Sequence, residues 1–221
     1  MSTILCIDTA LPLASVSVSQ NGNLLSERIS DAQKDHAAFL HPAIHSILKE
    51  LQIELQEINA VAVTIGPGSY TGLRVGLASA KGLCYALKKP LISLCTLETM
   101  AKQTQIVLAP TDEMLFCPMI DARRMEVFTA VYESDLTCMI NPHAKVLDKE
   151  SFQEILLKKK VCFSGNGSAK FMNLINHENA IHAYISTLSD AMAKMSDQYF
   201  NAAQFSQAAL IEPNYLKAYQ I

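Results

Sequence analysis

The 221-residue sequence lacks the marks of several common protein classes. No apolar run approaches the ~20 residues that a helix needs to cross a membrane. The first residues have neither the basic segment nor the long apolar segment of a secretion signal. A formal net charge of only −3 argues against a strong stand-alone nucleic-acid binder, which usually carries a basic face. The sequence therefore predicts a cytoplasmic protein with no membrane partner.

Motifs for metal binding and redox chemistry are also missing. The six cysteines include no pair with C-x-x-C spacing, so we expect buried free thiols. His41 and His45 are one helical turn apart, a spacing that can chelate a metal, but no glutamate follows His41 to complete H-E-x-x-H. We expect a surface or packing role for these two histidines, with a metallopeptidase as the third and last functional hypothesis.

What the sequence does contain indicates two lobes. Half of the residues are hydrophobic, which is enough for a sizeable core, and the length suits two similar lobes better than one compact domain. We expect a first lobe over residues 1–103 and a second over residues 104–221, with residues 104–114 as the linker. The last helix is an element that can pack back on the first lobe.

Hydrophobic periodicity predicts the order β-β-β-α-β-α-β in the first lobe. Residues 14–19 alternate strictly, as a half-buried strand does, and Asn21-Gly22 is a tight hairpin signal. Pro42 is expected to kink the first helix or to mark its first turn. The predicted first-lobe strands are 3–7, 14–19, 24–29, 61–65 and 90–95, and the helices 40–51, 70–87 and 97–103. The second lobe repeats this order in degraded form, with strands at 115–120, 126–132, 145–147 and 161–164 and helices at 151–157, 168–175 and 188–200.

The centre of the first lobe is a glycine turn between a strand and a helix, Gly66-Pro67-Gly68, with Ser69 as the helix N-cap. Free N–H groups at such a helix start suit an anion. However, the spacing G-x-G-x-x-x-G misses the dinucleotide fingerprint by one residue, and no lysine completes a P-loop. An anion or nucleotide contact is therefore one hypothesis, and its residues would be Asp8, Thr9, Gly66, Gly68 and Ser69.

Asp8 and Thr9, which close the first strand, have two interpretations. A carboxylate beside a hydroxyl group can hold a magnesium–phosphate group. Alternatively, a turn aspartate accepts hydrogen bonds from nearby backbone N–H groups. The residues alone divide these interpretations evenly.

The helix at 70–87 contains three interior glycines, each of which costs about 1 kcal/mol relative to alanine. Close contacts must compensate for this cost. They come either from packing on the lobe's own sheet or from a partner helix against a stripe that includes Leu73 and Leu77. The partner interface predicted from this second interpretation is centred on Leu73, Gly76 and Leu77.

A charged cluster follows the first strand of the second lobe. It comprises Asp121, Arg123, Arg124 and Glu126, and it reads either as an interlobe ion-pair cluster or as a contact for anions. No Ser/His/Asp or Cys/His order nominates a catalytic nucleophile.

Residues 66–83, followed by Ala86-Leu87, 90–92 and 96–98, closely resemble the bacterial TsaB (YeaZ) family. Ile7-Asp8-Thr9, Asp121-Ala-Arg-Arg124 and Tyr215-Leu216-Lys217 match in the same order, whereas residues 133–210 match more loosely. The resemblance implies an α/β protein of the ASKHA (actin/Hsp70/sugar-kinase-like) fold, with two RNase H-like lobes that have mixed sheets of the five-stranded type.

For function, the resemblance implies a non-catalytic scaffold with no intrinsic cofactor. Such proteins bind and activate the transferase TsaD and, with the ATPase TsaE, support threonylcarbamoylation of the adenosine next to the anticodon in ANN-decoding tRNAs. The catalytic relative holds a metal with two histidines of one helix and a later aspartate, and this chain shows no convincing copy of that set.

The resemblance further implies that helices at about 36–51 and 70–87 contact TsaD or a second copy, so that the chain alone is a homodimer. The interface predicted on these helices comprises Leu40, Ile44, Leu73, Gly76, Leu77 and Ala80. Contact with tRNA would be indirect, and ATP with Mg²⁺ would belong to the complex. The alternative hypothesis is an ATPase or phosphotransferase of the same fold that uses Asp8 and Thr9.

Overall fold

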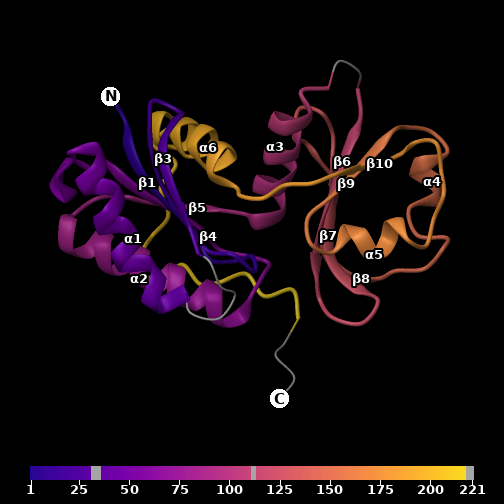
Figure 1. Cartoon of the computed structure of the whole chain (residues 1–221), viewed down its shortest axis with the longest axis horizontal. Helices are drawn as coiled ribbons and strands as arrows, with labels where there is room; N and C mark the ends of the chain where they lie inside the picture. The colour runs from indigo at the N-terminus through magenta and orange to yellow at the C-terminus, as the bar shows by residue number, and fades with distance from the viewer. Residues whose placement is uncertain (31–35, 111–112, 218–221) are drawn as a thin grey trace. The chain divides into compact units, whose positions relative to one another are not determined.

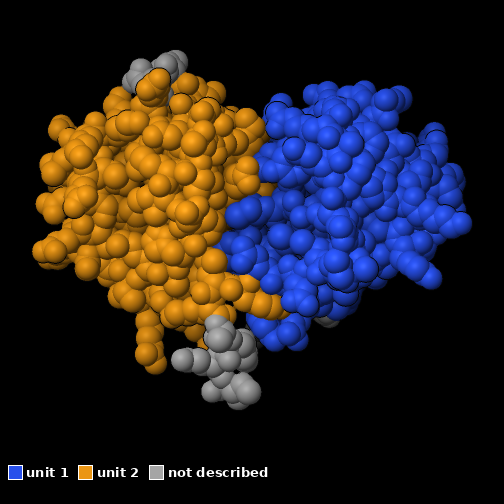
Figure 2. Space-filling view, turned by 180° about the vertical axis from the view of Figure 1, so that it is seen from behind, with its two compact units in different colours: residues 1–96, 187–214 blue, residues 97–186, 215–221 orange. Residues whose placement is uncertain are grey.

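The computed structural model describes residues 1–30, 36–110 and 113–217, which form an α/β protein (Figure 1). The chain divides into two compact units, residues 1–96 with 187–214 and residues 97–186 with 215–221 (Figure 2). The first unit ends at residue 96, earlier than the expected boundary after residue 103. It also includes residues 187–214, which contain the last helix, the element expected to be able to pack back on the first lobe.

Unit 1 is built on a five-stranded mixed sheet with the order β3-β2-β1-β4-β5. The first three strands are antiparallel, and β4 and β5 continue the sheet in parallel. Asn21 and Gly22 turn between β2 and β3 with φ angles of 48° and 75°, the left-handed region that this residue pair favours. The strands are β1 (Thr3–Asp8), β2 (Ser15–Gln20), β3 (Asn23–Ile29), β4 (Ala60–Thr64) and β5 (Leu91–Leu94).

Helices cover both faces of this sheet, with α1 (His36–Leu51) and α2 (Tyr70–Leu87) on one side and α6 (Ser189–Asn201) on the other (Figure 1). Every residue of β1 and β4 is buried for this reason. Pro42 lies in the interior of α1, on its exposed side, and not in the first turn. A short 3-10 helix (Leu55–Glu57) precedes β4.

Unit 2 contains a second five-stranded sheet with the order β10-β9-β6-β7-β8. Its core includes Phe152, Phe163 and Phe171, whose ring centroids lie 4.8 to 5.7 Å apart in edge-to-face contacts. The strands are β6 (Leu115–Asp121), β7 (Glu126–Tyr132), β8 (Cys138–Val146), β9 (Val161–Ser164) and β10 (Ala180–Ala183). The helices are α3 (Thr96–Leu108), α4 (Gln153–Leu156) and α5 (Ser168–Met172).

Three predictions for this region are wrong in detail. The linker expected from residue 104 is still helical, because α3 continues to Leu108. β8 begins at Cys138 rather than near residue 145, and it accommodates Pro142 because an edge strand tolerates a proline. β10 was not predicted at all, and its four residues are a weak signal.

Each sheet places its third, second, first, fourth and fifth strand side by side in that order. In each, the first three strands are antiparallel and the last two are parallel to the first. This duplicated topology is the ASKHA fold that the resemblance implies, and the prediction is confirmed. Among the described residues, no helix combines the length and the apolar character needed to span a membrane.

Candidate functional site

Asp8, at the end of β1, is a buried carboxylate whose Oδ1 atom is already bonded within the protein. It accepts hydrogen bonds from Thr64 Oγ1 at 2.6 Å and from the Ala10 N–H at 3.0 Å. Burial raises the pKa of Asp8, and these two hydrogen bonds lower it by less. The side chain thus accepts a backbone N–H group at the start of the turn, as the structural interpretation of Asp8 expects.

Thr9 and Ala10 lie directly against the glycines of the next turn and helix. Thr9 Oγ1 donates a hydrogen bond to Gly72 O at 2.8 Å. A Cβ atom on Gly72 would overlap the carbonyl oxygen of Thr9, and one on Gly76 would overlap its hydroxyl oxygen. A Cβ atom on Gly68 would lie only 2.5 Å from Ala10 O. These glycines are therefore needed so that α2 can approach the end of β1.

Three backbone N–H groups around the start of α2, those of Ser69, Gly72 and Leu73, are used inside the protein. Ser69 donates its N–H to Ala10 O at 2.8 Å, and its hydroxyl group accepts the Gly72 N–H at 3.2 Å, which confirms the predicted N-cap. The Leu73 N–H bonds to Ser69 O at 2.8 Å. An anion at this turn would have to compete with these bonds, so the anion hypothesis stays a prediction that this geometry does not favour.

Gly66 is enclosed by two other segments of unit 1. Its N–H donates to Thr96 Oγ1 at 3.1 Å, and its carbonyl oxygen accepts the Thr96 N–H at 2.9 Å. On another side, Asn214 donates its N–H to Ile65 O at 2.6 Å, and a Cβ atom on Gly66 would lie 2.5 Å from Asn214 O. With φ at 118°, this position requires glycine for its backbone conformation as well.

The six residues predicted to face a partner are instead part of the core of unit 1. The predicted interface is therefore wrong, because none of these residues is on the surface. The predicted residues of α2 face β4 and β1, and those of α1 pack into the same core beside α2. The buried residues are Leu40, Ile44, Leu73, Gly76, Leu77 and Ala80.

The opposite face of α2 is the one open to solvent. Tyr85 is 89% exposed, and a Cβ atom on Gly82 would meet nothing within 4 Å. The guanidinium group of Arg74 lies 4.2 Å from the centre of the Tyr70 ring on the same helix. We call this surface the outward face of α2, and its exposed residues are Thr71, Arg74, Ala78, Gly82, Tyr85 and Ala86. Sequence reasoning missed it, although these residues recur at helical spacing.

The histidine pair that raised the metal hypothesis is on the exposed side of α1. His41 and His45 both face solvent. Within residues 1–30, 36–110 and 113–217, no three His, Cys, Asp or Glu side chains gather in a way that could hold a metal ion.

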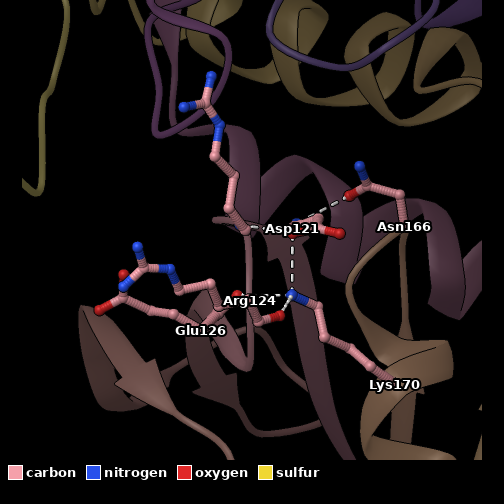
Figure 3. Close-up of polar contacts among 6 residues, drawn as sticks. Asp121, Arg124, Glu126, Asn166 and Lys170 are labelled. Carbon is pink, nitrogen blue, oxygen red and sulfur yellow. Dashed lines mark hydrogen bonds and ion pairs between the residues drawn. The ribbon is translucent and has the colours of Figure 1, made fainter.

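The charged cluster of the second lobe lies at the β6–β7 hairpin, and its ion pairs remain inside unit 2. Lys170 Nζ contacts Asp121 Oδ1 at 2.8 Å, as Figure 3 shows. Lys217 Nζ lies 2.6 Å from Glu126 Oε1. The described ion pairs thus account for both carboxylates of the cluster without an interlobe partner.

The family model described as "TsaD: tRNA N6-adenosine threonylcarbamoyltransferase" matches residues 27–219. The tRNA threonylcarbamoyladenosine biosynthesis protein TsaB of Buchnera aphidicola subsp. Acyrthosiphon pisum is 30% identical over 78% of this chain and 79% of its own length. The chain belongs to the TsaB (YeaZ) family. This is a family of tRNA threonylcarbamoyladenosine biosynthesis proteins.

Two further likenesses extend over nearly the whole chain. The TsaB protein of Bacillus subtilis (strain 168) is 28% identical, covering 97% of this chain and 94% of its own length. The solved structure of YeaZ from Pseudomonas aeruginosa has a TM-score of 0.83 at 21% identity, covering 98% of this chain and all of that one. At this identity, the structural likeness shows the fold alone.

Proposed function

We propose that this TsaB-family chain is a non-catalytic scaffold that binds and activates a TsaD-type transferase. With a TsaE-type ATPase, the assembly would threonylcarbamoylate the adenosine next to the anticodon in ANN-decoding tRNAs. The observation that carries this proposal is the outward face of α2, which presents small residues and a tyrosine that is 89% exposed. None of these residues is buried against the described part of unit 1.

Small side chains on a helix let a partner backbone approach closely, as Gly72 already does inside unit 1. Gly82 and Ala78 offer the same opportunity on the outside, and Tyr85 adds the large aromatic area that is enriched at interface centres. The same surface on a second copy would give an isologous homodimer when the transferase is absent. ATP with Mg²⁺ would then belong to the complex, and tRNA would be held mainly by the transferase.

A non-catalytic role is supported by the environment of Asp8. A carboxylate that is buried, and that accepts hydrogen bonds from Thr64 and Ala10 on Oδ1, is engaged in holding the turn. The alternative of an ATPase or phosphotransferase through Asp8 and Thr9 draws support from none of these contacts. Calorimetry of the isolated chain with Mg-ATP tests it, since such an enzyme binds the nucleotide without a partner.

The test of the scaffold proposal is co-elution with a TsaD-type subunit in gel filtration. Ala78→Glu places a charge on the outward face of α2, and it should abolish co-elution while the circular dichroism spectrum is unchanged. Ala169→Glu is the matched control, because Ala169 is an exposed helical alanine of unit 2. Normal co-elution of Ala78→Glu would exclude this face as the interface.

The reconstituted reaction provides the functional readout. With both partner subunits and tRNA present, omission of this chain should abolish formation of the modified nucleoside, and Ala78→Glu should reproduce that loss. Full modification without the chain would contradict the scaffold role.

A further inference from the structure

The β6–β7 hairpin turns through two successive arginines in an unfavourable backbone conformation. Arg123 and Arg124 have φ angles of 71° and 48°, the left-handed region that hairpin turns normally fill with Asn and Gly. Such a conformation costs about 1 to 2 kcal/mol for a residue with a Cβ atom. With two arginines at these positions, the turn is less stable than it would be with Asn-Gly. This cost indicates that the arginine side chains have a role of their own.

The turn is held firmly from below. Lys170 Nζ donates to Asp121 Oδ1 at 2.8 Å, to Arg124 O at 2.7 Å and to Glu126 O at 2.8 Å, so one ammonium group ties both ends of the hairpin together (Figure 3). The Asp121 N–H also donates to Asn166 Oδ1 at 3.1 Å. The backbone that carries the two arginines is therefore pre-organised by side chains of other segments of unit 2.

The carboxylates of the turn are already neutralised. Asp121 pairs with Lys170, and Glu126 pairs with Lys217. Partial burial raises the pKa of Asp121, but hydrogen bonds from Lys170 and from the Arg123 N–H outweigh it and lower the pKa, so the Lys170 tie persists at neutral pH.

The guanidinium groups of Arg123 and Arg124 make no ion pair or hydrogen bond with any other residue of the described ranges, and both residues are exposed. Four cationic side chains face two carboxylates here, which leaves a surplus of two positive charges. That surplus stands out in a chain whose formal net charge is −3.

We propose that this arginine turn, Arg123 with Arg124, binds the phosphate backbone of RNA. The inference rests on the proposed function, because an assembly that modifies tRNA presents RNA to its scaffold. Guanidinium forks bind phosphate oxygens in a bidentate manner, and adjacent forks on a fixed turn suit phosphates that follow one another along a strand. Contacts of this kind position the RNA without reading its sequence.

A protein partner is the less favoured occupant. Interfaces between proteins are centred on desolvated apolar or aromatic anchors. Between Asp121 and Glu126, the turn presents Ala122 and Met125 beside the arginines, with no aromatic residue. The overall negative charge of the chain limits the RNA affinity of the arginine turn alone. In the assembly, the transferase holds the same RNA nearby, so the effective concentration is high and the turn adds to the total affinity.

The probe is a fluorescein-labelled transcript of an ANN-decoding tRNA, titrated with the full chain alone while anisotropy is recorded at several salt concentrations. Arg123→Asn/Arg124→Gly removes both charges and supplies the residues that the turn prefers, so folding is retained. We expect its affinity to fall by about tenfold or more, since bonds to charged groups are lost. The slope of log K against log salt should become less steep by about one per arginine.

Two further variants test whether the guanidinium geometry matters beyond the charge, and whether the position of the charge matters. Arg123→Lys/Arg124→Lys keeps the charges, so the salt slope should persist while the affinity falls part of the way. Lys158→Gln/Lys160→Gln removes the same number of charges from exposed positions after α4, and it should leave affinity within about twofold of the wild type.

Three results would overturn the proposal. The first is that the wild-type chain shows no measurable binding at low salt. The second is that Arg123→Asn/Arg124→Gly leaves the RNA affinity and the salt slope unchanged. The third is that this variant loses co-elution with TsaD while its RNA affinity is intact, which would make the turn a protein contact. The RNA titration uses the chain alone and tests the arginine turn, whereas the co-elution of Ala78→Glu tests the scaffold interface. The two proposals can therefore fail independently. A failed scaffold would leave the RNA contact of the isolated chain unchanged.

Discussion

Thr9 and Gly72 form a contact that leaves no room for a methyl group. The Thr9 hydroxyl group donates to Gly72 O at 2.8 Å, and the Thr9 carbonyl oxygen occupies the place that a Cβ atom on Gly72 would need. This contact fixes the first turn of α2 on the end of β1. A stretch that resembles a phosphate-binding loop in sequence thus serves here as the joint between helix and sheet.

Glycine-to-alanine substitutions at two positions of α2 should have opposite effects. Gly72→Ala should lower the free energy of unfolding by about 1 to 3 kcal/mol, because the new methyl group meets backbone that cannot rotate away. Gly82→Ala should raise it by up to about 1 kcal/mol, because the position is open and alanine favours a helix. Urea denaturation of both variants measures the difference, and equal stabilities would refute the close contact.

Glutamate scanning of α2 should separate its two faces. Leu73→Glu should destabilise unit 1 by at least about 3 kcal/mol, since it buries an unpaired charge in the core. Ala78→Glu, on the outward face, should change stability by no more than about 0.5 kcal/mol. Thermal melts followed by circular dichroism provide the comparison. A stable, folded Leu73→Glu variant would show that this stripe is accessible after all.

Asp8→Asn should become more stable relative to the wild type as the pH rises. Because the pKa of Asp8 in the folded chain is raised above its usual 3.8, the folded state holds the proton more tightly than the unfolded state. That contribution to stability is complete below pH 3.8 and is lost as the pH rises through the raised pKa. Asparagine keeps the oxygen that Thr64 and Ala10 contact and does not titrate.

Urea denaturation of both proteins between pH 4 and neutrality measures this difference. A stability of Asp8→Asn that falls relative to the wild type as the pH rises would contradict the raised pKa. In the reconstituted reaction, Asp8→Asn should retain nucleoside modification if the chain is a scaffold, whereas a phosphotransferase that uses Asp8 would lose it.

The thiols should differ sharply in reactivity. Burial raises the pKa of Cys6 and Cys84 to about 11 and that of Cys117 and Cys162 to about 12, so they are protonated and enclosed at pH 8. Cys138 is exposed on the edge strand β8. Dithionitrobenzoate should therefore modify Cys138 first in the native protein and all six thiols after denaturation. The fast phase should be missing in Cys138→Ser, and its persistence there would place the reactive thiol elsewhere.

Local patterns were enough to predict most of unit 1. The alternation at 14–19 and the pair Asn21-Gly22 define the β2–β3 hairpin, and the N-cap at Ser69 marks the start of α2. β10 and the part of β8 before residue 145 escaped prediction because pairing with neighbouring strands determines them. β8 contains a proline, and the apolar run of β10 is too short.

The orientation of α2 could not be derived from its sequence. Both of its stripes contain small or apolar residues, so periodicity alone does not say which one faces the sheet. The contacts of Gly72 and Gly76 with Thr9 set the rotation of the helix, and they join residues more than sixty positions apart in the chain. The left-handed arginine turn depends in the same way on Lys170, which belongs to another element.

The return of α6 to unit 1 also determines the order in which the protein can be completed during synthesis. Residues 1–96 leave the ribosome long before residues 187–214, so the side of β1 that carries Cys6 has no cover until Ser196 and its helix arrive. A nascent chain that stops after unit 2 would expose this side of the sheet to chaperones and proteases. Unit 2 is continuous in sequence apart from the last residues of the chain. It can therefore fold before α6 is synthesised and packs on the sheet of unit 1.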